Sequence, residues 1–122
     1  MIEKLVDCLR ALAAPADIQV ARFPDFVCKA GELALDYADA LLLAFQCQQL
    51  QFTQEQRQAL QRVDDLLDGM SGEQNAHIWT DAALGSAPEW VAVRDAAMAA
   101  VHALGMRYEP PGRDVRVTPR HP

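Results

Sequence analysis

Apolar residues recur with the 3.6-residue period of an α-helix in four segments of this chain. The first segment covers residues 2–13, and the second, which is the longest, covers residues 23–49. The third runs from Thr53 to about Met70, and the fourth from Ser86 to Leu104. A helix with one apolar face buries that face against its neighbours. The pattern therefore predicts an all-α fold, a bundle of four main helices with short extra helical turns.

The longest of these helices is predicted to be the central member of the bundle. Its apolar positions begin as a stripe, and the sequence Leu-Leu-Leu-Ala-Phe over residues 41–45 makes it apolar nearly all round. Such a surface is buried only when neighbours lie on several sides. Pro24 suits the first turn of this helix, where the missing N–H of a proline costs nothing.

Capping signals mark the ends of the later helices. Thr53 followed by Gln56, and Ser86 followed by Glu89, both have the spacing of a capping box. Gly105 is placed to end the last helix in the left-handed conformation that glycine adopts easily. We therefore expect helices that begin after Thr53 and Ser86, and a helix that ends at Gly105.

The connections between the helices are short, and the chain reads as one domain with a tail. Residues 16–22 are expected to form a linker or a short turn, and Thr80 or Asp81 can cap a short helical turn. Residues 106–122 are rich in proline and arginine and contain few apolar anchors. We expect a helical bundle domain over residues 1–105 and a flexible, poorly ordered C-terminal tail over residues 106–122.

The composition adds an acidic charge to this picture. The chain has 122 residues, of which 51% are hydrophobic, and a formal net charge of -6. Phosphates would be repelled by this charge, which argues against direct binding of nucleic acid. The uncharged run over residues 40–54 is too short and too rich in glutamine to span a bilayer. Because the first residues also lack the pattern of a signal peptide, we expect a cytoplasmic protein with no membrane segment.

No motif for catalysis or for metal binding stands out. The three cysteines lack the spacing of a zinc site and are expected to be reduced, apolar fillers of the core: Cys8, Cys28 and Cys47. No histidine follows a glutamate by three residues, as di-metal helical bundles require. The sequence also has no Gly-rich phosphate loop and no recognisable nucleophile with its base. We expect a protein that is not an enzyme and uses no metal and no cofactor.

Acidic residues recur at helical spacing on the second helix. Intervals of seven, four and three residues place them on one face, interrupted by Lys29: Asp25, Glu32, Asp36 and Asp39. A solvated face is the commonest interpretation of such a pattern. The alternative is a surface that binds a basic partner.

A second acidic group and a tryptophan follow further along the chain. Asp64, Asp65 and Asp68 lie near the end of the third helix, where the helix dipole disfavours negative charge. A locally unfavourable charge is a signal of binding, and the alternative is that nearby arginines offset it. Trp79 precedes the last helix and is either a core anchor or a contact for a partner.

Several stretches of this chain resemble a known class of proteins. Residues 79–84 (Trp-Thr-Asp-Ala-Ala-Leu), residues 86–90 (Ser-Ala-Pro-Glu-Trp) and the helix that closes at Leu104 and Gly105 look like a pattern in small bacterial proteins, and residues 32–37 are similar too. These proteins are the immunity partners of polymorphic and contact-dependent toxins. The resemblance implies a protein that binds one toxin domain tightly and blocks its active site. Many such toxins are basic nucleases, which suits an acidic inhibitor.

The leading hypothesis is therefore a non-enzymatic immunity protein that neutralises a cognate, basic bacterial toxin domain. Its partner-binding residues would be the acids of the second and third helices together with the tryptophan: Glu32, Asp36, Asp39, Asp64, Asp65, Asp68 and Trp79. The alternative is a homo-oligomeric structural or adaptor protein of the bacterial cytoplasm. In that case the apolar remainder of the second helix would form a homodimer interface.

Overall fold

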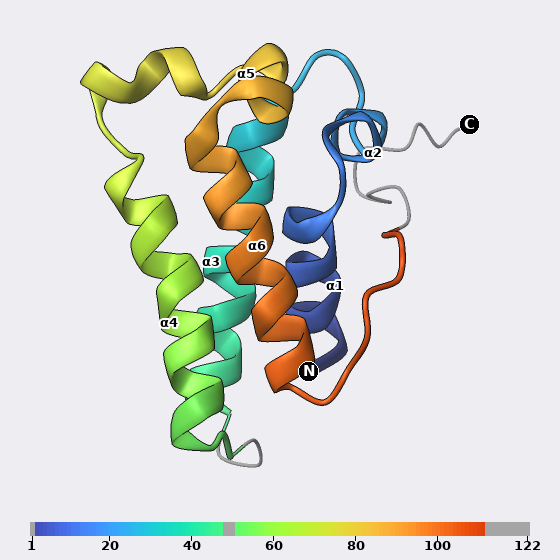
Figure 1. Ribbon diagram of the computed structural model, residues 1–122, viewed down its shortest axis with the longest axis vertical. Coiled ribbons are helices and arrows are strands. Elements are labelled where there is room, and N and C mark those ends of the chain that lie inside the picture. Colours follow the sequence, from blue (N-terminus) through green and yellow to red (C-terminus); the bar gives the residue numbers. More distant parts are fainter. Residues whose placement is uncertain (1, 48–50, 112–122) are drawn as a thin grey trace.

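The computed structural model describes residues 2–47 and 51–111, and these residues form an all-α fold (Figure 1). No strand occurs within these two ranges. The predicted fold class is therefore confirmed. The elements, including one 3-10 helix named η1, are α1 (Ile2–Ala13), α2 (Ala16–Ala21), α3 (Lys29–Gln46), α4 (Gln54–Gly69), η1 (Glu73–Ile78), α5 (Asp81–Ser86) and α6 (Pro88–Ala103).

The four long helices α1, α3, α4 and α6 form the bundle, and η1 and α5 lie at one end of it (Figure 1). The closest packing joins α6 to α4, α6 to α1, and α1 to α3. α3 and α4 are neighbours with a looser contact. The short α2 packs against α5.

The core lies between the four long helices and contains large side chains from each of them. Among the fully buried residues are Leu5, Leu9, Leu12, Leu33, Tyr37, Leu60, Val63, Trp90, Val93 and Val101. The Trp90 indole N–H donates a hydrogen bond to the carbonyl oxygen of Ile78 at 2.6 Å, and the Tyr37 hydroxyl donates to that of Leu60 at 2.7 Å. Both polar tips are thus satisfied inside the core, as burial of a polar group requires.

Both predicted ends of α1, the predicted start of α4 and the predicted end of α6 are confirmed. α1 occupies residues 2–13, as its apolar period predicts. The Thr53 hydroxyl accepts from the Gln56 backbone N–H, and the Gln56 side chain accepts from the Thr53 backbone N–H, so the capping box is complete. Gly105 has φ of +79°, the left-handed conformation. Each of these signals acts within a few residues, which is why the sequence alone predicts them.

Two predicted helix starts are wrong. Residues 23–28 are not helical, and α3 begins at Lys29, because Phe23 turns into the core while the chain passes from α2 to α3. Residues 48–49, the predicted end of this helix, lie outside the described residues. Ser86 does not cap α6: it ends α5, and its hydroxyl donates to the Ala82 carbonyl oxygen at 2.9 Å. α6 instead starts with Pro88 in its first turn.

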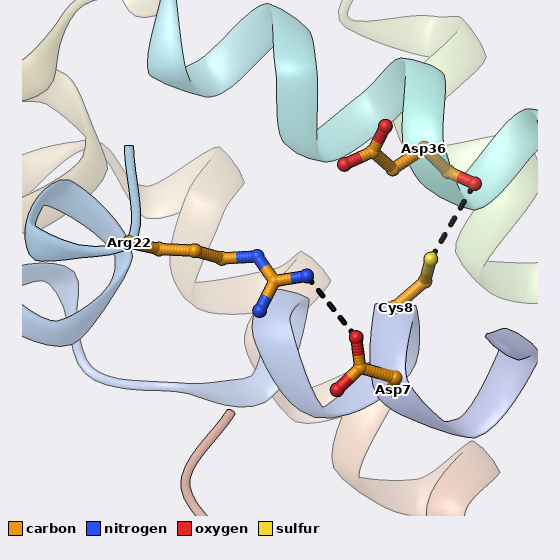
Figure 2. A network of polar contacts seen from close by, with 4 residues as sticks. All are labelled: Asp7, Cys8, Arg22 and Asp36. Atoms are coloured by element: carbon orange, nitrogen blue, oxygen red, sulfur yellow. Dashed lines mark hydrogen bonds and ion pairs between the residues drawn. The ribbon is translucent and has the colours of Figure 1, made fainter. Parts of the chain in front are cut away.

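A polar junction ties α1 to α2 and α3 (Figure 2). Arg22, which follows α2 and is buried, lies 3.1 Å from the Asp7 carboxylate on α1. Next to it, the Cys8 thiol donates to the Asp36 carbonyl oxygen on α3 at 3.5 Å. Burial raises the pKa of the Cys8 thiol to about 11. The prediction of a core cysteine is therefore confirmed for Cys8 and wrong for Cys28, which is exposed, while Cys47 is half-buried. Cys28 and Cys47 flank the two ends of α3 and so lie at the edge of the bundle.

Alkaline pH is expected to destabilise the protein through Cys8. The unfolded chain releases this proton near pH 9, the ordinary value, whereas the folded chain holds it to about pH 11. The unfolded state then binds fewer protons, so the free energy of unfolding falls by roughly 2–3 kcal/mol across this interval. Burial also raises the pKa of Tyr37, which adds to the fall above pH 10.

Urea unfolding between pH 8 and 11 measures this effect. A Cys8→Ala variant should show a flatter dependence on pH, because it lacks the buried thiol. Cys28→Ala, which removes an exposed thiol, serves as the matched control and should follow the wild type. Identical slopes in all three proteins would contradict the role of Cys8.

The first residues after α6 pack against the bundle. The Arg10 guanidinium donates to the Arg107 carbonyl oxygen through Nε at 3.1 Å and Nη2 at 2.7 Å. Tyr108 is half-buried and contacts the core. The predicted domain boundary at Gly105 is therefore not the end of the packed structure. The rest of the predicted tail, residues 112–122, lies outside the described residues.

Two truncations test where the packed structure ends. Removal of the residues after Gly105 should lower Tm by several degrees, because partial burial of an aromatic side chain contributes about 1–2 kcal/mol. Removal of only the residues after Pro111 retains Arg107 and Tyr108, and should preserve most of the stability. Thermal unfolding followed by circular dichroism compares the two. Equal Tm values would show that residues 106–111 contribute nothing.

Candidate protein-binding surface

One side of α3 presents large apolar side chains to solvent. Leu35 is 60% exposed, Leu42 57%, Leu43 50% and Phe45 39%. The prediction that this helix is surrounded by neighbours is therefore wrong. Within the run 41–45, only Leu41 and Ala44 are buried, because α1 and α4 cover a single side of α3 and no described element covers the other.

The exposed apolar residues are arranged in a line. We call Leu35, Ala38, Leu42 and Phe45 the outer stripe. Their spacing of three, four and three residues places them on one face of the helix, as in the seam of a coiled coil. α3 thus has two apolar faces, one buried in the core and one open.

The outer stripe borders an open groove between α3 and α4. The groove has a volume of about 180 Å³. We call it the acidic groove, and its principal lining residues are Leu35, Ala38, Asp64, Leu67, Asp68 and Trp79. None of the described residues that line it is basic. The groove therefore combines an apolar wall from α3 with two carboxylates from α4.

Trp79 is held rigidly at one end of the acidic groove. Its indole N–H donates to the Met70 carbonyl oxygen at 2.8 Å. Its ring packs edge-to-face on Trp90, with a distance of 5.3 Å between ring centroids, a favourable geometry for an aromatic pair. The side chain is half-buried, so it is partly a core anchor and partly a wall of the groove.

The opposite end of the outer stripe has a different character. Phe45 lines a second open groove of about 320 Å³ together with residues of the first turns of α4. The Arg57 guanidinium lies 5.4 Å from the centre of the Phe45 ring, a cation–π distance. The face formed by α3 and α4 is therefore acidic beside Trp79 and basic beside Phe45.

The structure brings together three of the predicted partner-binding residues: Asp64, Asp68 and Trp79 line one groove. Asp65 turns away, and lines the outer surface of α4 with Arg62 and Leu66. Asp39 is exposed on α3 and Glu32 is half-buried there. By helical geometry, both lie on the side of Leu35 opposite to the groove.

Asp36 does not belong to this exposed surface, and its prediction as an exposed partner-binding residue is wrong. It is only 8% exposed. Figure 2 shows its carboxylate on the same side of α3 as Cys8 and Arg22. Helical spacing places Asp36 and Asp39 on the same side of α3. α1 covers the edge of that side, so Asp36 is buried and Asp39 remains exposed.

Lys29 does not neutralise the acids of the outer surface. Its side chain is buried, and its Nζ lies 3.2 Å from the Asp81 carboxylate at the start of α5. Asp25, the first acid of the predicted face, lies before α3 in the non-helical connection. The acids beside the outer stripe are thus Asp39 on one side and Asp64 and Asp68 on the other.

The described part of the chain lacks two features that are typical of other functional classes. The described residues contain no group of three or more His, Cys, Asp or Glu side chains arranged to hold a metal ion. None of the described helices combines the length and apolarity needed to cross a bilayer. Comparisons with protein-family models, curated proteins and solved structures found no significant match.

The leading prediction missed the outer stripe because it placed the long helix at the centre of the bundle, and only the homodimer alternative left apolar residues of this helix exposed. The signal was present, since the outer stripe and the buried residues Leu33, Tyr37 and Ala40 form two separate helical faces. Periodicity cannot say which of two apolar faces is covered. That choice depends on where the other helices lie.

Neighbouring leucines on α3 offer a direct test of this arrangement. Leu41→Ala should lower the free energy of unfolding by about 2–5 kcal/mol, because Leu41 is buried. Leu42→Ala should change it by less than about 0.5 kcal/mol, since exposed side chains contribute little. Urea unfolding of both variants at low protein concentration makes the comparison. A similar cost for the two substitutions would show that Leu42 is covered.

Proposed function

We propose that the protein is a non-enzymatic inhibitor that binds a basic partner domain on the face formed by α3 and α4. The observation that carries the proposal is the exposed outer stripe beside Asp39, Asp64 and Asp68. Contiguous exposed apolar side chains rimmed by polar residues mark protein interaction sites. The partner that the toxin-immunity resemblance implies is a cognate bacterial toxin domain.

Charge and apolar contact have separate roles in this proposal. The net charge of -6 and the carboxylates beside the outer stripe would attract a basic domain and orient it before contact. Burial of Leu35, Leu42 and Trp79 would then slow dissociation, because desolvated apolar and aromatic anchors supply most of the binding energy at an interface. Inhibition follows from occlusion of the partner's active site and needs no catalytic group on this chain.

A homodimer is the second candidate, and the same exposed leucines favour it. Two copies could pair through their outer stripes about a two-fold axis. In an antiparallel pair, however, residues near the middle of the stripe meet their own copies, so the two Asp39 carboxylates would approach each other. Like charges across an interface are unfavourable. The acids therefore suit a basic partner better than a second copy.

Charge reversal tests the proposed role of the acids. The variant Asp39→Lys/Asp64→Lys/Asp68→Lys should associate roughly tenfold or more slowly with the partner at low salt, because steering is lost. The difference should shrink above about 0.1 M salt, where the Debye length falls to about 10 Å. The partner is first recovered from the native host by pull-down and purified. Stopped-flow association at two salt concentrations then gives the rates.

The matched control carries the same change of net charge elsewhere. Asp17, Asp95 and Glu109 are exposed and lie outside the acidic groove, so Asp17→Lys/Asp95→Lys/Glu109→Lys should slow association much less. Equal slowing by both triple variants would show that association depends on net charge and not on the position of the acids. Wild-type rates in the groove variant would refute the proposal. A stable dimer that binds no partner would favour the structural alternative.

A further inference from the structure

We infer that the face formed by α3 and α4 receives a single amphipathic α-helix of the partner, with Lys or Arg residues on both flanks of its apolar side. This inference rests on the proposed function and specifies the partner at the same site. It commits to one secondary structure, one spacing of apolar residues and one sign of charge.

The shape of the surface suits a helix. The outer stripe follows one helix, and the acidic groove separates it from a second, α4. From Leu35 to Phe45 the stripe extends about 15 Å, or close to three helical turns, at 1.5 Å per residue. A helix laid along two others in this way forms a three-helix contact, and helix-in-groove binding is a common mode of peptide recognition.

The spacing of the outer stripe specifies the apolar residues of the partner. Side chains spaced by three and four residues, as in the outer stripe, pack between those of a partner helix whose own apolar residues recur at i, i+3 or i+4, and i+7. Ala38 is small and lies between the larger Leu35 and Leu42, so it leaves room for a large side chain at that point. The partner's central apolar residue, leucine or larger, would occupy this position beside Asp64 and Trp79.

The acids on both sides of the stripe specify the charge. Asp39 lies on one side, and Asp64 and Asp68 lie on the other. A helix seated between them presents its flanks to both sets. Lys or Arg at those flanks would form charge-assisted contacts, whereas acidic flanks would be repelled. The same charges disfavour a second copy of this chain and a nucleic acid.

The arginine at one end of the surface indicates the direction in which the partner helix runs. Arg57 lies beside Phe45, at the end of the stripe remote from Asp64 and Asp68. The N-terminus of a helix carries partial positive charge and its C-terminus partial negative charge. The partner helix would therefore place its N-terminal end and its cations near Trp79 and its C-terminal end near Arg57, so that it runs parallel to α3.

Synthetic helical peptides provide probes that do not require the native partner. The first has leucine at heptad a and d positions and lysine on both flanks. The second has the same leucines with glutamate flanks. The third keeps the lysines and replaces the leucines by glutamine. Titration of the full chain, followed by tryptophan fluorescence and by amide chemical shifts, gives affinity and location.

Only the first peptide should bind well. Its largest shifts should fall on Leu35, Ala38, Asp64 and Asp68, with a change at the Trp79 indole. Asp64→Asn/Asp68→Asn should weaken its binding roughly tenfold, since hydrogen bonds to charged groups are among the stronger ones. Asp17→Asn/Asp95→Asn, which removes two exposed carboxylates outside the acidic groove, is the matched control and should bind like the wild type. Thermal unfolding verifies that each variant folds.

Several outcomes would overturn the inference. Equal binding of the glutamate-flanked peptide would show that the surface does not select cations. Equal binding of the peptide with glutamine in place of leucine would show that apolar contact is not required. Shifts confined to another face would place the site elsewhere. A dimer in analytical ultracentrifugation that dissociates when Leu42→Asp is introduced would assign the stripe to a second copy.

The peptide experiment and the charge-reversal experiment test the helix inference and the proposed function separately. If the native partner binds and is slowed by the charge-reversal variant while no lysine-flanked peptide binds, the helix is wrong and the inhibitor proposal stands. If the first peptide binds in the acidic groove but the charge-reversal variant associates normally with the native partner, the groove selects helices and the proposed inhibitory contact lies elsewhere.

Discussion

α6 packs against α1 on one side and α4 on the other, and the rest of the bundle depends on this double contact. Its buried face consists largely of small residues: Val93, Ala96, Ala97, Ala100 and Val101. Small side chains let neighbouring helix backbones approach closely. Trp90 lies at the N-terminal end of this face and donates its indole N–H to the Ile78 carbonyl oxygen, which fixes the connection before α5 to the core. The last helix in the sequence therefore occupies the position predicted for the long helix.

The central position of α6 explains why α3 has an open side. α3 packs closely on α1 but only loosely on α4. α1 therefore covers most of the buried face of α3, and the hydrogen bond from the Tyr37 hydroxyl to the Leu60 carbonyl oxygen joins α3 to α4. The exposed apolar side chains on the other side of α3 include the outer stripe, where, within the described residues, only Phe45 has aromatic or cation–π contacts, with Phe52 and Arg57. The looser contact with α4 also leaves the acidic groove. The candidate binding surface is thus a consequence of how the core is packed.

The acids of α3 and α4 acquire different roles from their positions in the bundle. Asp36 faces α1 and takes part in the buried junction with Cys8, whereas Asp39, one turn further along, faces solvent. Asp64 and Asp68 line a groove with Trp79, but Asp65 lies on the outer surface of α4. Residues of one chemical type therefore divide between structural and surface positions, and only the surface set is available to a partner.

The sequence by itself determined the features that depend on neighbouring residues along the chain. The period of α1, the Thr53 capping box and the left-handed Gly105 each arise from contacts within a few positions, and the all-α class follows from their sum. The sequence also singled out the acids of α4, which lie near the unfavourable C-terminal end of the helix dipole, and Trp79, a tryptophan placed before the last helix. Tertiary structure alone decided which apolar face of α3 is covered, which acid is buried and which acids meet Trp79. Helical periodicity specifies the faces of a helix, whereas their burial depends on packing between helices distant in sequence.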